Sequence, residues 1–231
     1  MIRTCRLLVI IIALTFAPFV AAQTQDSGTA EPQRGAVGRT FDNIFNYLNM
    51  AGTTKASDFR PLTQWERGHL YLQSMVNPFG FLKTGSSAGL DQWNDKPKEW
   101  EQGASGYGKR FANILGQYSI QRTVTYGLSA GLHEDNRYFN SGKTGFWSRT
   151  WYAAESGLLA RDDDGKRHLS YSQIGGTAAG AFLSRPWLPP SQHSAGDAAI
   201  SFGITMGINI GSGVLKEFLP DVVRKISKKD Q

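Results

Sequence analysis

Two segments of this chain carry a small side chain at every fourth position, and this repeat limits the folds that they can enter. The repeat consists of Ser119, Thr123, Gly127 and Gly131 in the first segment and of Ala199, Gly203, Gly207 and Gly211 in the second. In an α-helix, residues four apart lie on one face, and small residues there let a second helix backbone approach closely. The repeat therefore favours helices that pack against each other through ladders of Gly, Ala and Ser.

The same two segments, 119–132 and 198–214, also alternate apolar and small residues, which is the pattern of a β-strand. Each glycine weakens an isolated helix by about 1 kcal/mol relative to alanine, so local propensity slightly favours strands for 198–214. A secreted β-barrel, however, needs about eight alternating segments, and this chain shows two. We therefore expect a mainly α fold with one helical domain over 40–220. The alternative is a small β-structure or barrel built from these two segments.

Local signals place several element boundaries. Apolar residues at helical spacing predict a helix over 41–48, and a capping box at Thr63–Glu66 predicts the start of a second. Asn77-Pro78 predicts the end of that helix and the start of another. A polar, glycine-containing stretch predicts a loop over 94–108, and the acidic run 162–166 predicts a turn.

The first residues have the form of a secretory signal. Arg3 and Arg6 precede an apolar stretch over 7–20, which is too short for an ordinary membrane span of about 20 residues. Small residues then lead to Ala22, so cleavage is expected before Gln23. We predict a signal peptide over 1–22 and a bacterial protein that works outside the cytoplasm, in the periplasm or cell envelope.

Composition narrows the function classes for the mature chain. Its first part, 23–39, is rich in small and polar residues and is predicted to be a flexible leader. The only cysteine, Cys5, leaves with the signal, which excludes disulfides and thiol catalysis. Loss of Arg3 and Arg6 lowers the formal net charge from +6 to +4, so we expect no nucleic-acid partner. The mean hydropathy of −0.33 argues against a protein with many membrane-spanning helices.

The densest polar cluster of the sequence is His133-Glu134-Asp135 with Arg137. In a hydrolase, Glu134 or Asp135 could act as the base, His133 as its partner and Arg137 as an anion clamp. The structural alternative is a helix end, with His133 near the last carbonyls and Arg137 paired with a carboxylate. We commit to no catalytic residue and keep these four as candidates.

Other motifs do not support a cofactor or metal site. The segment 127–131 matches the nucleophile elbow of serine hydrolases, but 85–89 matches it as well, as expected of a chain full of glycine and serine. Ser141–Thr144 resembles the end of a phosphate loop but lacks the first glycine of that motif. Glu66 and His69 form one Glu-x-x-His pair, whereas a di-iron bundle needs two.

The C-terminal tail, 221–231, is basic. Its cations are Arg224, Lys225, Lys228 and Lys229, and apolar residues lie between them. This pattern is typical of a short amphipathic helix on anionic lipid, or of a solvated tail. The four cations are therefore the candidate membrane-surface residues.

Five blocks of the chain carry a resemblance to known sequences. They lie at 97–103, 107–111, 133–139, 171–176 and 216–221. Together they resemble a family of exported bacterial proteins that has no established activity, in which proline usually stands where this chain has Asn136. The resemblance implies a mainly helical fold and export, and it transfers no catalytic residue.

These observations predict an exported, non-catalytic, envelope-associated helical protein. Its expected partners are an anionic membrane surface or a second copy of itself, with no small-molecule ligand and no cofactor. The alternative function is a hydrolase that uses the cluster of His133, Glu134, Asp135 and Arg137.

Overall fold

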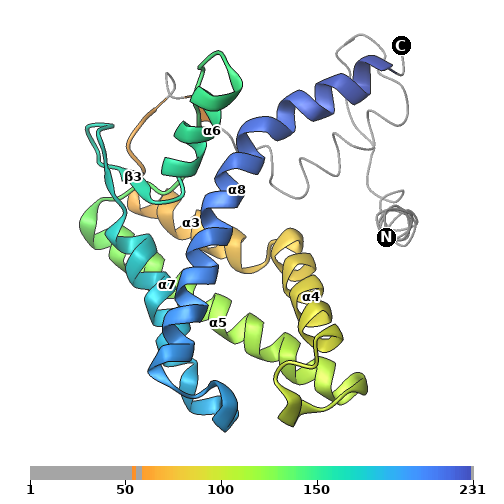
Figure 1. Cartoon of the computed structure of the whole chain (residues 1–231). Coiled ribbons are helices and arrows are strands. Elements are labelled where there is room, and N and C mark those ends of the chain that lie inside the picture. Colours follow the sequence, from red (N-terminus) through yellow and green to blue (C-terminus); the bar gives the residue numbers. More distant parts are fainter. Residues whose placement is uncertain (1–53, 56–58, 230–231) are drawn as a thin grey trace, which may run out of the picture. The chain divides into compact units, whose positions relative to one another are not determined.

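The computed structural model describes residues 54–55 and 59–229, and α-helices dominate this part of the chain (Figure 1). The predicted signal peptide, the predicted leader and the predicted helix over 41–48 lie outside the described residues. The helices are α3 (Gln64–Met75), α4 (Pro78–Trp93), α5 (Gly103–Leu132), α6 (Phe146–Glu155), α7 (Tyr171–Leu183) and α8 (Ala195–Lys229). The mainly α prediction is confirmed.

Short elements connect the helices. Single 3-10 turns occur at η3 (Lys98–Trp100), η4 (Arg185–Trp187) and η5 (Pro190–Gln192). Two small sheets are present: β1 (Thr54–Lys55) pairs in parallel with β2 (Phe139–Asn140), and β3 (Leu159–Arg161) pairs antiparallel with β4 (Arg167–Leu169). Both segments for which strands were the alternative are helical, because 119–132 lies in α5 and 198–214 in α8.

Several predicted boundaries follow from short-range chemistry. The capping box is present, because Thr63 Oγ1 accepts from the Glu66 N–H at 3.2 Å and Glu66 Oε2 accepts from the Thr63 N–H at 3.0 Å. Pro78 opens α4, where its missing N–H costs nothing. The turn at 162–166 joins β3 to β4 as predicted. The predicted loop over 94–108 is wrong in its last part, because α5 begins at Gly103.

The long helix α5 is the centre of the packing. Helices α3, α4 and α7 contact it, while α8 contacts α7 and α6. In Figure 1 the dark blue α8 follows α7 along its lower half and passes α6 above. The helix that carries the second small-residue repeat therefore covers one side of α7 rather than entering a central core.

Small residues do bring helices together, but at positions on α7 that are four residues apart. They are Ser172, Gly176 and Gly180 on α7 and Ser184 at its C-cap, and all four are buried. An added Cβ on Gly176 would lie 2.0 Å from Thr125 Oγ1 of α5, and one on Gly180 would lie 2.9 Å from the carbonyl oxygen of Gln117. Only glycine permits this approach of α7 to α5.

The glycines of the two predicted repeats have no such role. For Gly127 and Gly131 on α5, and for Gly203, Gly207 and Gly211 on α8, no described atom outside the local helix backbone lies within 4 Å of an added Cβ. The prediction that a helix approaches Gly207 is therefore wrong. The contact between α6 and α8 uses a different face, where an added Cβ on Gly213 would lie 2.4 Å from the carbonyl oxygen of Ala153.

Polar and charged side chains fill much of the interior of the described chain, and many large apolar side chains are exposed. The buried charged residues are Arg67, Arg110, Glu134, Asp135, Arg185 and Glu217, while many of the buried apolar residues are alanines. Five of the six tryptophans are exposed: Trp65, Trp93, Trp147, Trp151 and Trp187.

Candidate functional site

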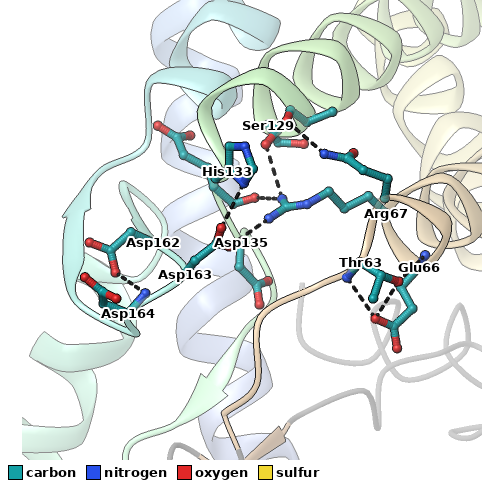
Figure 2. Close-up of polar contacts among 12 residues, drawn as sticks. Thr63, Glu66, Arg67, Ser129, His133, Asp135, Asp162, Asp163 and Asp164 are labelled. Carbon is teal, nitrogen blue, oxygen red and sulfur yellow. Dashed lines mark hydrogen bonds and ion pairs between the residues drawn. The ribbon is translucent and has the colours of Figure 1, made fainter.

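The predicted polar cluster begins where α5 ends. His133 is the residue after the last turn of α5 and has a left-handed backbone with φ of 57°, while its N–H bonds to the carbonyl of Ser129. Its exposed ring points to the β3–β4 turn, where Nδ1 lies 2.8 Å from Asp163 Oδ2 (Figure 2). His133 is thus a helix-terminating residue paired with one surface carboxylate.

Glu134 is buried and fixes the start of α7. Its carboxylate accepts the N–H groups of Tyr171 at 3.0 Å and of Ser172 at 2.9 Å, and the hydroxyl groups of Ser170 and Ser172. A negative charge at the first turn of a helix is favourable, because the N–H groups there carry a partial positive charge. The carboxylate of Glu134 is therefore occupied in joining the end of α5 to the beginning of α7.

Arg67 of α3 completes the junction, and the sequence analysis missed it. Its buried guanidinium donates to the carbonyl oxygens of Ser129 and Glu134, and it lies 3.5 Å from Asp163 Oδ1 (Figure 2). A cation is favourable at a helix C-terminus, where free carbonyls carry partial negative charge. No local pattern could have identified this role, because its partners lie more than 60 residues away in the chain.

Asp135 and Arg137 are bound to each other. The Arg137 guanidinium donates to Asp135 Oδ2 at 2.6 Å and 2.9 Å, and the backbone of Asp135 exchanges two hydrogen bonds with Arg161. Both side chains line a cavity of about 10 Å³, which is roughly the space of one water molecule. An organic substrate does not fit in this cavity.

These placements define what the cluster can do chemically. Nucleophilic catalysis needs a nucleophile within hydrogen-bond reach of its base. Among the described residues, no hydroxyl group bonds to the ring of His133, and Asp135 and Arg137 bind each other. The hydroxyl groups of Ser170 and Ser172 do bond to the Glu134 carboxylate, but both serines are fully buried at the start of α7, where no substrate reaches them. Within the same residues, no group of three His, Cys, Asp or Glu side chains could hold a metal ion.

A second buried carboxylate, Glu217, ties α8 to α6. It accepts from Tyr138 Oη at 2.7 Å, from Ser141 Oγ at 2.5 Å and from Arg149 Nε at 2.9 Å. Arg149 also binds Asp221 at 2.5 Å. Burial alone would raise the pKa of Glu217, but hydrogen bonds from Ser141, Tyr138 and Arg149 outweigh it and hold that pKa below its ordinary value.

A third polar junction surrounds Arg110 of α5. This fully buried guanidinium donates to the carbonyl oxygens of Lys96, Pro97 and Glu101 at 2.7–2.9 Å. An added Cβ on Gly106 would lie 2.3 Å from the carbonyl oxygen of Glu101, so glycine is required there. The sequence blocks around Arg110, Glu134 and Glu217 thus share a structural role, since each contributes a buried charge that fixes a helix.

The candidate membrane-surface residues lie on the last turns of α8. Arg224, Lys225, Lys228 and Lys229 all belong to this helix, which runs to Lys229 without a break at residue 221. Before them, 198–215 contains no charged residue. Ile200, Ile204 and Ile208 on this stretch are exposed, the first two to 64% and 60%, and Gly203 and Gly207 lie open beside them.

Length and composition set α8 apart within the described chain. The stretch Ala195–Val222 is the one described helix that is long and apolar enough to cross a membrane, and only 17% of its most apolar window is buried. Comparisons of the chain with protein-family models, with curated proteins and with solved structures found no match.

Proposed function

We propose that this chain is an exported, envelope-associated protein that binds a lipid membrane through the free face of α8, and that its role is binding rather than catalysis. The main observation behind this proposal is that α8 is strongly apolar but mostly not buried. A core helix of this hydropathy would be mostly covered, whereas most of this one faces outward. Apolar surface of this kind gains about 25 cal/mol per Å² when it leaves water.

Packing favours a helix that lies in the membrane surface. One face of α8 carries the buried residues Ala198, Met206, Gly213 and Glu217, which pack on the protein. The isoleucines and open glycines occupy the other side. Interfacial helices have this division, with one apolar face in the lipid and a polar or packed face away from it.

Charge supports the same partner. The cations of residues 224–229 lie on the same helix after the apolar stretch, and the chain without the predicted signal peptide carries a formal net charge of +4. Anionic headgroups attract such basic segments by about 1 kcal/mol per Lys or Arg near the surface. We therefore expect tighter binding to anionic than to zwitterionic membranes, and weaker binding at high salt.

Vesicle flotation tests the proposal. The full chain should float with vesicles of phosphatidylethanolamine and phosphatidylglycerol, and the triple variant Ile200→Ser/Ile204→Ser/Ile208→Ser should remain largely in the dense fraction. The matched control, Leu72→Ser/Val76→Ser/Leu90→Ser, removes three comparably exposed apolar side chains from α3, its C-cap and α4, and it should float like the wild type. Far-ultraviolet circular dichroism checks that each variant is folded. Flotation of the α8 variant at the wild-type level would contradict the proposal.

A further inference from the structure

Three cations from three helices lie within electrostatic reach of one another. They are Lys83 of α4, Arg122 of α5 and Lys216 of α8. Loss of surrounding water and the charges of Arg122 and Lys83 lower the pKa of the Lys216 amine, while loss of water and the charge of Arg122 lower the pKa of the Lys83 amine. All three residues are nevertheless exposed. The fold therefore gathers three positive charges where a ligand can reach them.

Packing between α4 and α5 sets the position of two of these cations. The guanidinium carbon of Arg122 lies 5.0 Å from the centre of the Tyr118 ring. The same tyrosine contacts α4, because an added Cβ on Gly80 would lie 3.5 Å from Tyr118 Oη. Lys83 follows Gly80 by three residues, which is about one turn of helix. Arg122 and Lys83 are thus held near one contact between the two helices.

No carboxylate balances this cationic cluster within the described part of the chain. Neither a hydrogen bond nor an ion pair joins Lys83, Arg122 or Lys216 to another described side chain, and Arg122 has the Tyr118 ring as its contact. Every other arginine with a described side chain donates at least one hydrogen bond. Like charges repel one another, and the repulsion grows where water is displaced. An anion bound among the three cations would therefore be stabilised.

Exposed apolar side chains border the cluster. Phe81 and Leu82 come directly before the lysine of α4, and Leu215 comes directly before that of α8. Helical geometry places Lys216 about 80° around α8 from Ile208, so this lysine borders the free face of α8. Cations at the border of an apolar helix face can reach lipid headgroups while that face contacts the acyl chains. An anion that carries apolar chains fits these surroundings.

We propose that Lys83, Arg122 and Lys216 form a binding site for the phosphate of one anionic phospholipid, whose acyl chains lie along the neighbouring apolar residues. The inference rests on the proposed membrane function and names the lipid group that the protein recognises. A guanidinium binds phosphate oxygens through paired hydrogen bonds, and an ammonium group adds a compact positive charge. The choline of a zwitterionic lipid would bring a further positive charge to the cluster, so we expect phosphatidylcholine to bind more weakly.

Isothermal titration calorimetry of the full chain with dihexanoyl phosphatidylglycerol, below its micelle concentration, tests the site without a membrane surface. Lys83→Gln/Lys216→Gln should bind the lipid about tenfold more weakly or worse, because two charges that face the phosphate are removed. The matched control, Lys98→Gln/Lys109→Gln, removes the same charge from two other exposed lysines and should change the affinity less than about twofold. Without lipid, the first variant should melt at or above the wild-type temperature, because repulsion is relieved.

The other outcomes separate the site from its alternatives. Equal weakening in the two lysine variants would overturn the site, in favour of a general attraction to positive charge. Glycerol phosphate that binds as tightly as the short-chain lipid would overturn the lipid assignment, in favour of a soluble phosphate ester. A wild-type chain that floats with vesicles but does not bind the short-chain lipid would overturn the site alone. A chain that binds this lipid but does not float would contradict the proposed function alone.

Discussion

Helices α7 and α8 carry the same repeat of small residues and use it in opposite ways. On α7 the repeat is Ser172, Gly176, Gly180 and Ser184, and on α8 it is Ala199, Gly203, Gly207 and Gly211. Gly176 and Gly180 of the first repeat lie too close to α5 to admit a Cβ, while an added Cβ on any of the three α8 glycines would have no described neighbour within 4 Å. A repeat of this kind shows that a close approach is possible, and the surrounding fold decides whether it occurs.

The two helices also begin differently. The first turn of α7 has a local cap, because Ser170 Oγ accepts from the Gln173 N–H, and it is also held by Glu134, which follows α5 in the chain. The first turn of α8 is held locally, because Ser194 Oγ accepts from the Asp197 N–H and Asp197 accepts in return from Ser194. The start of α7 therefore depends in part on a residue from another segment of the fold. The start of α8 is capped by its own residues, and one face of α8 is exposed.

The largest expected effect is at the buried repeat. Gly176→Leu should destabilise the protein by about 3 kcal/mol or more, because even its Cβ would overlap Thr125. Urea unfolding followed by circular dichroism measures this loss. The control is Gly207→Leu on α8, for which we expect a change of less than about 1 kcal/mol. Equal losses of unfolding free energy in Gly176→Leu and Gly207→Leu would contradict the difference in packing between α7 and α8.

The second-largest effect on stability is expected at Glu134, the buried carboxylate that caps α7. Glu134→Ala should cost about 2 kcal/mol, because the N–H groups of Tyr171 and Ser172 and the nearby hydroxyl groups lose their acceptor. Glu134→Gln keeps an acceptor oxygen and should lose less. The same unfolding measurement ranks the variants, and an unchanged stability in Glu134→Ala would show that this carboxylate does not hold α7.

Alanine should have opposite effects at the two repeats. Gly207→Ala should stabilise the protein in lipid-free buffer by about 1 kcal/mol, since alanine favours helix and open space surrounds the site. Gly180→Ala should instead destabilise it, because the added Cβ would lie 2.9 Å from the carbonyl oxygen of Gln117. The change in melting temperature shows whether each substitution stabilises or destabilises the protein. A lower melting temperature for Gly207→Ala would show that another part of the fold packs against Gly207.

The smallest effect concerns the local cap of α8. Hydrogen bonds from the Ser194 hydroxyl and N–H lower the pKa of Asp197. The cap therefore contributes to stability above the ordinary carboxyl pKa of 3.8, and this contribution is lost as the pH falls through the lowered value. Ser194→Ala should lower the melting temperature slightly near neutral pH, and less in acid. A cost that stays constant between these conditions would contradict this assignment.

Short-range signals in the sequence predicted several helix starts, but local propensity slightly favoured strands for 198–214, which lies in α8, and no local signal predicted the contacts between helices. The capping box at Thr63–Glu66 was predictable because both partners lie within three residues. The bonds of Arg67 and Glu217 join residues more than 60 positions apart, and no local pattern encodes such pairs. The glycines of α7 were missed for a related reason, since their partner is a face of α5 that only the assembled fold defines.

The same limit applies to the candidate site. The sequence identified His133, Glu134, Asp135 and Arg137 as a cluster because they are adjacent. It could not show that Glu134 reaches α7 or that Asp135 and Arg137 bind each other. The exposed tryptophans of α6 were also missed, because exposure depends on the packing around a residue.

The central question about this protein is where the free face of α8 lies when a membrane is present. A nitroxide label on a single cysteine at Ile204, in a Cys5→Ser background, reports this directly through its relaxation by oxygen and by a water-soluble nickel chelate. With anionic vesicles, we expect the label at position 204 to become accessible to oxygen and protected from nickel. A label at Asp164, in the exposed β3–β4 turn, should stay accessible to nickel. Nickel access at position 204 that vesicles do not change would contradict the assignment of α8 to the membrane surface.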